Sequence, residues 1–454
     1  MKALVLLSSL GVIALLAEIF SFKKLLYPIV LLGLVITFTL NVFDWDTNRL
    51  YFKMMQFDNY AVVFTGLIIV VAFFWFIMAE GFFKEESNQT DHFALVLFAL
   101  VGAVMMVSYS NMAMLFLGIE ILSIPMYILA GSNKENLASN EAAFKYLIMG
   151  AFATGFLLFG IALIYGATGS FDLGEISAAV SAQGVSPIFS VGVLLMLVGM
   201  AFKVSAAPFH FWAPDVYEGA PTVITAFMAT IVKTAAFAAF LRLFTTTFMD
   251  AGHDWMNVVW VMAALTLLVG NITAVVQTST KRMLAYSSVA HAGYMLLALL
   301  AANDYSNGAI FFYAAAYSLG SIATFAIVHI ISTSKNSDSV DAFNGLAKTN
   351  PLLAAVMTIA LLSLAGIPPT AGFFAKYYIF TSAFVAGNVG LVLIAIIASL
   401  IGVYYYFRLI IAMYFRESDS QTVPVEANHK ILLIVIAALI VAMGILPDCL
   451  IRLL

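Results

Sequence analysis

Apolar stretches of about 20 residues follow one another along almost the whole chain, separated by short polar loops. A helix of that length crosses the hydrocarbon core of a bilayer. The 454 residues are 63% hydrophobic and 10% charged, whereas a soluble domain carries about a quarter charged residues. Because nearly every segment is apolar all round, one water-surrounded core cannot cover the helices. We therefore predict an all-α integral membrane protein, a single polytopic membrane domain over residues 1–454.

The apolar pattern predicts about fourteen transmembrane helices. The fourth and fifth are divided by little more than residues 110–111, so thirteen is the alternative count. The run from Ala3 to Ala17 could be taken for a signal peptide, but no small-residue cleavage site follows it, which favours a first spanning helix. The predicted spans are residues 3–20, 25–43, 60–83, 92–109, 111–131, 141–167, 187–212, 221–248, 255–276, 283–301, 305–333, 351–383, 387–414 and 430–450.

Positively charged loop residues predict the orientation, because short cytoplasmic loops carry an excess of Lys and Arg. Ten of these residues lie in odd-numbered loops and four in even loops or at the termini. This places both termini in the periplasm, which requires an even helix count and favours fourteen. The odd-loop residues are Lys23, Lys24, Lys84, Lys134, Lys281, Arg282, Lys335, Lys348, Arg416 and Lys430; the others are Lys2, Arg49, Lys53 and Arg452.

Prolines interrupt the seventh and twelfth predicted helices. Lys203 precedes Pro208 in one, and Lys376 follows residues 368–369 in the other. Proline frees backbone groups that lipid cannot satisfy, so such breaks lie where protein or water covers them. The breaks are five helices apart, and an odd spacing inverts the second half across the membrane. We predict two inverted five-helix repeats, helices 4–8 and 9–13, and matching breaks of this kind point to a transport site.

These repeats divide the membrane domain into four predicted parts. Residues 1–90 hold three N-terminal helices, and residues 91–250 hold the first repeat. The inverted second repeat covers residues 254–415, and the C-terminal helix lies within residues 429–454.

Four charged residues are the main candidates inside predicted helices, where a charge at the centre costs roughly 2.5–3.5 kcal/mol and is usually functional. Lys233 lies too deep for its stem to reach the headgroups; a static pair with a carboxylate is the alternative. Lys203, beside its break, is suited either to relay a proton or to satisfy freed carbonyls. Glu120 needs a cation, with Lys203 or Lys233 as partner, and such a pair forms an electrostatic switch. For Lys376, snorkelling to the surface competes with burial.

Weaker candidates complete the set. Lys145 lies four residues after Glu141, a good spacing for a surface salt bridge, so a relay role and a surface pair stay open. His291 is suited to relay protons or simply to hydrogen-bond between helices, as are His210 and His329. A structural role is the better interpretation for the charges nearer helix ends, Glu18, Glu80, Arg242 and Arg408.

Several other chemistries are excluded by composition. The single cysteine, Cys449, cannot form an intramolecular disulfide or bind an iron–sulfur cluster by itself. The sequence contains no dinucleotide-binding, P-loop or zinc-protease motif. Its net charge of −4 is spread over loops and argues against nucleic-acid binding. We therefore expect no cofactor and no metal on this chain.

Several motifs resemble one family. The run from Phe202 to Thr222 is similar to the signature of the antiporter-like subunits of respiratory complex I. Its Asp-Val-Tyr-Glu-Gly-Ala-Pro segment, residues 215–221, favours the N-type subunits of NADH-quinone oxidoreductases over the sister subunits. The similarity runs from about residue 60 to 415. Further matches are Gly118-Ile-Glu120 with Pro125-Met-Tyr127, Glu141-Ala-Ala-Phe-Lys145-Tyr146, Lys281 to His291, and Gly366 to Lys376.

The resemblance implies fourteen helices with the same inverted repeats, and proton translocation outward across the bacterial inner membrane. The chain would be a translocase subunit of a NADH-quinone oxidoreductase without a redox site of its own. NADH, FMN, iron–sulfur clusters and quinone are implied on partner subunits, and neighbouring antiporter-like subunits and lipid are implied partners. The implied roles are a Glu120–Lys203 switch, Lys233 as a connecting lysine, Lys376 at the outlet, His291 between half-channels, and Lys145 as a family-typical residue.

Two alternatives remain open at this stage. A subunit of a multisubunit sodium/proton antiporter would share the fold and the broken helices. A membrane scaffold would use its buried charges only structurally. Copurification with flavin, iron–sulfur clusters and NADH oxidation separates the first alternative from a NADH-quinone oxidoreductase.

Overall fold

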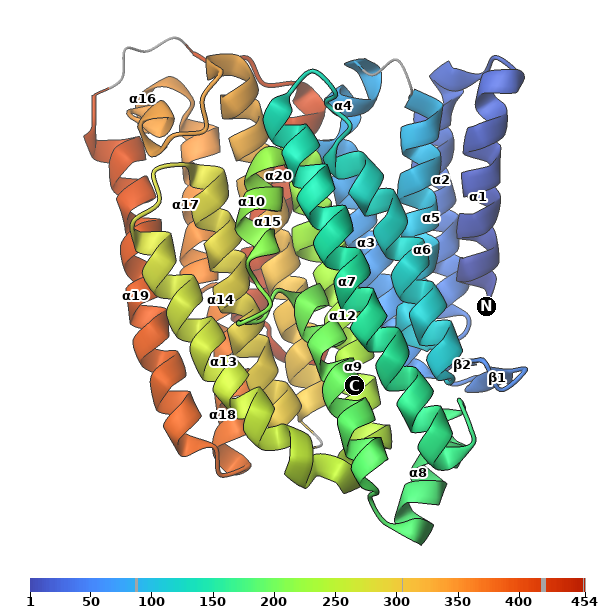
Figure 1. Cartoon of the computed structure of the whole chain (residues 1–454). Helices are drawn as coiled ribbons and strands as arrows, with labels where there is room; N and C mark the ends of the chain where they lie inside the picture. The colour runs from blue at the N-terminus through green and yellow to red at the C-terminus, as the bar shows by residue number, and fades with distance from the viewer. Residues whose placement is uncertain (86–88, 304, 418–421, 452, 454) are drawn as a thin grey trace. The chain divides into compact units, whose positions relative to one another are not determined.

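The computed structural model describes residues 1–85, 89–303, 305–417, 422–451 and 453, without the side chains of residues 84 and 85. Among these residues, thirteen helical segments are long and apolar enough to cross a membrane (Figure 1). The predicted twelfth span corresponds to two shorter helices. The predicted all-α integral membrane fold is thus confirmed, with one two-stranded hairpin added. Arg452 and the side chain of Lys84, which entered the orientation argument, lie outside the described residues.

The chain forms two compact units. Unit 1 comprises Met1–Ser205 and Ile231–Val259, and unit 2 comprises Ala206–Thr230 and Trp260–Leu453. Each unit has its own buried helices, and the division passes through the seventh, eighth and ninth predicted spans.

Unit 1 begins with three apolar helices and a hairpin. In the hairpin Leu50 pairs with Gln56 in antiparallel register. The Asp58 carboxylate caps the third helix by accepting a hydrogen bond from the Ala61 backbone. The predicted span 60–83 is in fact two helices, α3 and α4. The elements are α1 (Lys2–Ile19), α2 (Lys23–Val42), β1 (Arg49–Tyr51), β2 (Met55–Phe57), α3 (Asn59–Met78) and α4 (Glu80–Glu85).

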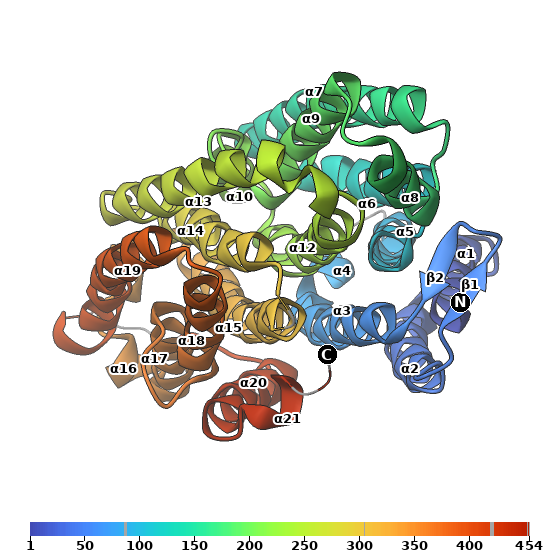
Figure 2. The same ribbon diagram turned by 90° about the horizontal axis from the view of Figure 1, so that it is seen from below.

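The next five helices complete the first stretch of unit 1. Tyr109, Ser110 and Asn111 separate α5 from α6, so the fourth and fifth predicted spans are distinct helices. The short helix α8, capped by Asp172, was not predicted because it is too polar to form a span. Within unit 1, α1 packs on α2 and α5, α5 on α6, and α7 on α9 (Figure 2). The helices are α5 (Gln89–Ser108), α6 (Met112–Ala130), α7 (Leu137–Thr168), α8 (Leu173–Gln183) and α9 (Pro187–Val204).

The helix that carries Lys233 has a π-helical turn on each side. The α-helical part, α12 (Lys233–Arg242), follows η1 (Met228–Val232) and precedes η2 (Leu243–Thr247). A π turn is a local departure from α-helical hydrogen bonding. Here the hydroxyls of Tyr60 and Tyr109 donate to the carbonyls of Ala238 and Ala239, each at 2.8 Å. A 3-10 turn, η3 (Met249–Ala251), then leads into α13 (Gly252–Val275).

Unit 2 is built around α15, which packs on α14, α17, α18 and α20 (Figure 2). Both α14 and α15 are almost wholly buried. The elements of unit 2, besides the second part of α13, are α10 (Trp212–Gly219), α11 (Thr222–Phe227), α14 (Thr280–Ala301), α15 (Ser306–Lys335), η4 (Val340–Phe343), α16 (Leu346–Thr349), α17 (Pro351–Ala365), α18 (Ala371–Val385), α19 (Val389–Phe415), α20 (Ala427–Ile445) and α21 (Asp448–Ile451).

Both proline-containing runs interrupt their helices. Helix α9 stops at Val204, so the predicted span 187–212 is too long, because the prolines that follow cannot continue the helical hydrogen bonds. Side chains satisfy backbone groups freed at each break. In unit 2 the Ala207 N–H donates to the Thr266 hydroxyl at 2.8 Å, and the Gly372 N–H donates to the Ser363 hydroxyl at 3.0 Å. Gly366 ends α17 with a φ of +85°, which favours glycine.

Helices α5 and α6 approach each other closely at Gly102. A Cβ atom at this position would lie 2.4 Å from the Leu122 backbone nitrogen, so the backbone itself blocks any larger residue. Small residues of this kind let membrane helices pack at short distance.

We expect Gly102→Ala to lower the melting temperature of the detergent-solubilised protein. Overpacking costs about 1–3 kcal/mol, which outweighs the roughly 1 kcal/mol of helix propensity that alanine adds. Thermal unfolding measures the difference. Gly155→Ala in α7 is the matched control, since its Cβ would meet nothing within 4 Å. An equal melting temperature for the two variants would contradict this account of α5–α6 packing.

Candidate functional site

Lys203 lies at the last turn of α9 and reaches across to α6 within unit 1. Its side chain is buried, with 6% exposed. The ammonium group donates to the Ser123 hydroxyl at 2.5 Å and to the Tyr127 hydroxyl at 3.5 Å, and it lies 5.7 Å from the centre of the Tyr127 ring. Ser123 in turn donates to the carbonyl of Ile119. The neighbours of this lysine are therefore neutral oxygens of one helix.

Glu120 lies on the same helix as these hydroxyls, but it does not form the expected direct pair. Its Oε1 accepts a hydrogen bond from the Thr154 hydroxyl on α7 at 2.9 Å, and the residue is half-buried. Within the described residues, no ion pair of 4.0 Å or less joins Glu120 to Lys203. In the structure the Lys203 ammonium group donates instead to Ser123, one turn further along α6.

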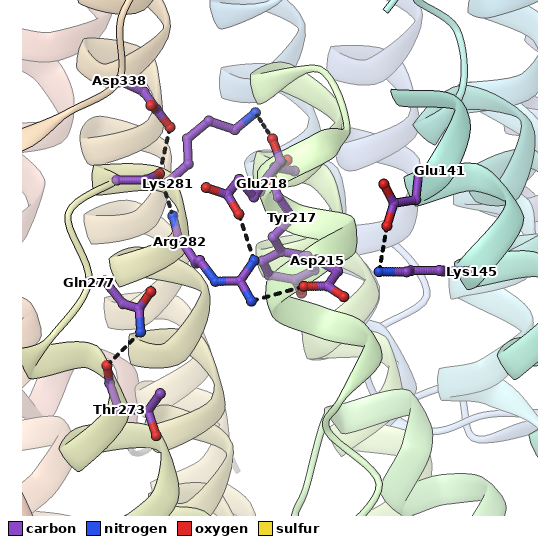
Figure 3. A network of polar contacts seen from close by, with 12 residues as sticks. Glu141, Lys145, Asp215, Tyr217, Glu218, Thr273, Gln277, Lys281, Arg282 and Asp338 are labelled. Atoms are coloured by element: carbon purple, nitrogen blue, oxygen red, sulfur yellow. Dashed lines mark hydrogen bonds and ion pairs between the residues drawn. The ribbon is translucent and has the colours of Figure 1, made fainter. Parts of the chain in front are cut away.

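The other two candidates of unit 1 differ in burial. Lys233 begins α12 with 2% of its surface exposed, and this helix packs on α3, α5 and α9. Lys145 makes the expected pair with Glu141, four residues earlier, at 2.7 Å (Figure 3). Both side chains of that pair are at least 36% exposed, which favours the surface salt bridge over a buried relay. At the end of α12, Arg242 pairs with Asp58 at 2.6 Å, which agrees with a structural role.

Lys376 lies in unit 2, where its ammonium group fills the break between α17 and α18. It donates to the Ala365 carbonyl and to the Ser399 hydroxyl, each at 2.7 Å. The ammonium nitrogen also lies 4.8 Å from the centre of the Tyr294 ring, a cation–π contact. With 7% of its surface exposed, Lys376 does not snorkel out of the unit. The lysine thus satisfies a carbonyl that the break frees, a role that the sequence suggested for Lys203.

His291 lies on α14 in unit 2 with tyrosines on both ring nitrogens. Its Nδ1 is 2.6 Å from the Tyr313 hydroxyl, and its Nε2 is 3.3 Å from the Tyr406 hydroxyl. Tyr406 also shares a hydrogen bond with Ser287. A narrow cavity of about 10 Å³ beside the histidine is lined by His291, Tyr313, Ala316, Tyr317, Ser363, Leu364, Gly372 and Ala375. The cavity therefore joins the histidine to the break that holds Lys376.

A polar link made of hydroxyls and an amide connects this region further. Tyr405 donates to the Asn271 side chain at 3.2 Å, and that amide donates to the Tyr294 hydroxyl at 3.3 Å. The Tyr294 ring centre in turn lies 4.8 Å from the ammonium nitrogen of Lys376. Sequence reasoning missed these residues because buried tyrosines and serines are common in membrane helices.

Charged residues at one end of unit 2 form a network that the sequence did not predict (Figure 3). Arg282 bonds to the carboxylates of Asp215 and Glu218 at 2.9 and 2.6 Å. The buried ammonium group of Lys281 donates to the carbonyls of Glu218 and Ala220, at 2.8 and 2.7 Å, and so satisfies the C-terminal end of α10. The start of α14 thus holds α10 by two cations. In the sequence, the adjacent basic residues Lys281 and Arg282 and the acidic residues of α10 are the features from which this network could have been predicted.

The remaining histidines do not join a metal-binding group. Among the described residues, no three His, Cys, Asp or Glu side chains are arranged to hold a metal ion. His210 lies in the segment between α9 and α10 and belongs to unit 2, and His329 lies on α15.

Comparison with known proteins assigns the family. A family model described as "NADH:quinone oxidoreductase/Mrp antiporter, TM" matches residues 109–402. A relative from Cytophaga hutchinsonii, named NADH-quinone oxidoreductase subunit N, is 48% identical over 100% of this chain and 99% of its own. This chain belongs to the NADH:quinone oxidoreductase/Mrp antiporter membrane-subunit family. Another subunit N of this family, from Flavobacterium psychrophilum, is 42% identical over the full length of both chains.

Solved structures agree with this family. A chain of respiratory complex I from Thermus thermophilus is 34% identical, with a TM-score of 0.87 over 99% of this chain and 98% of its own. A chain of an archaeal membrane-bound sulfane sulfur reductase is 26% identical, with a TM-score of 0.90 over 100% and 96% of the two chains. A chain of the Mrp complex from Dietzia sp. is 20% identical, with a TM-score of 0.88 over 100% and 95%, and shares the fold.

We expect Arg282→Gln to loosen α10. The test places one thiol at buried Val216, as Val216→Cys, in a background where exposed Cys449 is replaced by serine. Two half-exposed ion pairs together contribute about 1 kcal/mol, which corresponds to roughly fivefold faster labelling by a water-soluble maleimide.

The control for this test is Glu141→Gln, which breaks the exposed pair with Lys145 in unit 1 and leaves the labelling rate unchanged. Equal rates for Arg282→Gln and its parent would show that the Arg282 pairs do not hold α10.

Proposed function

We propose that this chain is the N-type membrane subunit of a proton-pumping NADH-quinone oxidoreductase and carries protons through buried lysine and glutamate side chains. The observation that carries the proposal is the position of two ammonium groups, Lys203 and Lys376, buried at the two interrupted helices of a chain 48% identical to a named subunit N. Buried ionisable residues at broken helices are typical of ion pathways.

The contacts of the two lysines suit proton transfer. Each ammonium group bonds to neutral oxygens, so its charge is not fixed by a permanent carboxylate partner. A lysine in this setting is able to release its proton and to take up another, whereas an arginine is not. Approach of Glu120 to Lys203 would stabilise the charged lysine and its withdrawal would favour release. Glu120 and Ser123, the hydroxyl partner of Lys203, both lie on α6, about one turn apart.

We infer the following roles in the assembly. Lys203 and Glu120 form the switch, Lys233 and His291 connect the two halves, and Lys376 serves the outlet. Lys145 is the weakest member because of its exposed pair with Glu141. The chain would act as a translocase subunit without a redox site, while NADH, FMN, iron–sulfur clusters and quinone bind to partner subunits. It would lie in the bacterial inner membrane with both termini in the periplasm, beside other antiporter-like subunits.

The sodium/proton antiporter alternative has weaker support. The Mrp chain is 20% identical to this one, and a likeness at that level supports a shared fold only. The two relatives described above, which cover the whole chain, are both named subunit N. Purification of the chain from its own membranes with flavin, iron–sulfur clusters and NADH oxidation would support the oxidoreductase. Its isolation with other antiporter subunits and without flavin would overturn the proposal.

We expect Lys203→Met and Lys376→Met each to abolish most NADH-driven proton uptake into inverted membrane vesicles. Lys203→Arg keeps the positive charge but holds its proton, so it should pump no better than Lys203→Met. The measurement is quenching of an acridine dye, normalised to the amount of assembled complex. The control, Lys134→Met, changes an exposed loop lysine and should pump normally.

These variants separate a relay from a scaffold. A structural charge would be replaced successfully by arginine and not by methionine. Assembled Lys203→Met complex that pumps at the wild-type rate would overturn the proton-relay function.

A further inference from the structure

Lys233 begins a short α-helical segment that is anchored on the side opposite to this lysine. The segment, α12, lies between the π turns η1 and η2. At about 100° per residue, the positions five, six and nine residues after Lys233 lie about 140°, 240° and 180° around the helix from it, on its opposite face. These positions are Ala238, Ala239 and Arg242, and each of them bonds to another part of unit 1. The proposed function uses Lys233 and leaves these bonds without a role.

Two tyrosines hold the backbone of α12 at this face. The Tyr60 hydroxyl donates to the Ala238 carbonyl at 2.8 Å. The Tyr109 hydroxyl donates to the Ala239 carbonyl, also at 2.8 Å. The Ala239 carbonyl accepts a second hydrogen bond from its own helix, from the Leu243 N–H. Because a carbonyl oxygen has two lone pairs, the tyrosine bond anchors α12 sideways without replacing a helical bond.

Both tyrosines belong to backbone that is itself fixed in unit 1. Tyr60 lies in the first turn of α3, two residues after Asp58, which caps α3 and bonds to Arg242 at 2.6 Å. The Arg242 guanidinium also lies 4.8 Å from the centre of the Tyr60 ring. Tyr109 follows α5, is fully buried, and forms an antiparallel β-bridge with Met55 of the hairpin. The start of α3 and the segment after α5 thus present three anchoring side chains to α12.

The π turn η2, directly after α12, gives this anchoring its importance. A π turn holds one residue more than an α-helical turn, so its loss or movement turns the adjoining segment by about 100° and shifts it by about 1.5 Å along the axis. Such a rotation of α12 would point Lys233 in a different direction among α3, α5 and α9, the helices that pack on it. The two tyrosine bonds oppose the rotation, because both would have to break.

We propose that Tyr60 and Tyr109 are positioning residues of the proton relay, which hold α12 in the rotational position that aims the Lys233 ammonium group along its path. Their bonds lie five and six residues beyond the lysine, about 8 Å along the helix axis, so they act on it through the rotation of the helix. Neither hydroxyl carries a proton in this role. The inference rests on the proposed function for the role of Lys233, whereas the anchoring of α12 does not depend on that function.

The test uses the intact NADH-quinone oxidoreductase in inverted membrane vesicles. Tyr60→Phe and Tyr109→Phe each remove one hydroxyl and keep the aromatic ring. Loss of one hydrogen bond changes an equilibrium by about fivefold. We therefore expect proton uptake per NADH oxidised to fall about two- to fivefold in each single variant and about tenfold in the double variant. The matched control, Tyr165→Phe, removes the hydroxyl of a tyrosine on α7 that is 45% exposed, and it should pump normally.

Two readouts distinguish positioning from a general loss of stability. A structure of the double variant within the complex should show α12 rotated and the Lys233 side chain displaced. Replacement of Tyr109 by 4-aminophenylalanine keeps a hydrogen-bond donor on the ring and should restore most of the pumping. NADH oxidation by a water-soluble electron acceptor reports how much complex has assembled. If the double variant does not assemble, the single variants decide, because each keeps one tyrosine bond and the pair of Arg242 with Asp58.

The outcomes for this positioning role and for the proposed function differ. Wild-type pumping by the tyrosine variants, or weak pumping with α12 and Lys233 unmoved, would overturn the positioning role. Wild-type pumping by Lys233→Met would overturn it too, since no orientation of the lysine would then matter. In each case a loss of pumping in Lys203→Met leaves the function standing, and wild-type pumping by Lys203→Met overturns the function. A loss that 4-aminophenylalanine reverses, with Lys233 displaced in the double variant, would establish the positioning role.

Discussion

Solvation of buried ammonium groups is the constraint on which the interior of this protein depends. Hydrocarbon offers no acceptor, so every N–H of a buried lysine must bond to the protein or to trapped water. Lys203 finds two hydroxyls, Lys376 finds a carbonyl and a hydroxyl, and Lys281 finds two carbonyls. These oxygens are all neutral. A charge held in this way responds strongly to any carboxylate that approaches, which is what a proton switch requires.

Broken helices and buried lysines are two parts of one arrangement. The end of α17 leaves carbonyls without helical donors, and the lysine of α18 turns back to satisfy the carbonyl of Ala365. At the C-terminal end of α10, Lys281 likewise donates to the carbonyls of Glu218 and Ala220. A proline break therefore creates the site for a cation and, beside Gly372, part of a narrow cavity. This is why interrupted helices persist in a membrane protein at positions where a continuous helix would be more stable.

Neutral hydroxyls extend these sites into longer paths. In unit 2, tyrosine and serine side chains surround His291, and an Asn271 amide joins Tyr405 to Tyr294. Asn271 orients hydroxyls but conducts protons poorly, since its amide does not readily exchange a proton.

The sequence by itself determined the solvent of this protein, the positions of its spans and the two interruptions, because hydropathy and proline act over a few neighbouring residues. It also identified the buried charges, including Lys203, Lys233 and Lys376. It did not determine their hydrogen-bond partners, because those partners are distant in the sequence. Lys203 and Ser123 are 80 residues apart, and Glu120 accepts a hydrogen bond from Thr154, 34 residues away. Only the tertiary structure decided that Lys281 caps α10 and that Lys376 donates to the Ala365 carbonyl. Hydrogen bonds between distant helices depend on packing, and a serine or tyrosine looks the same in the sequence whether it bonds to its own helix or completes a path.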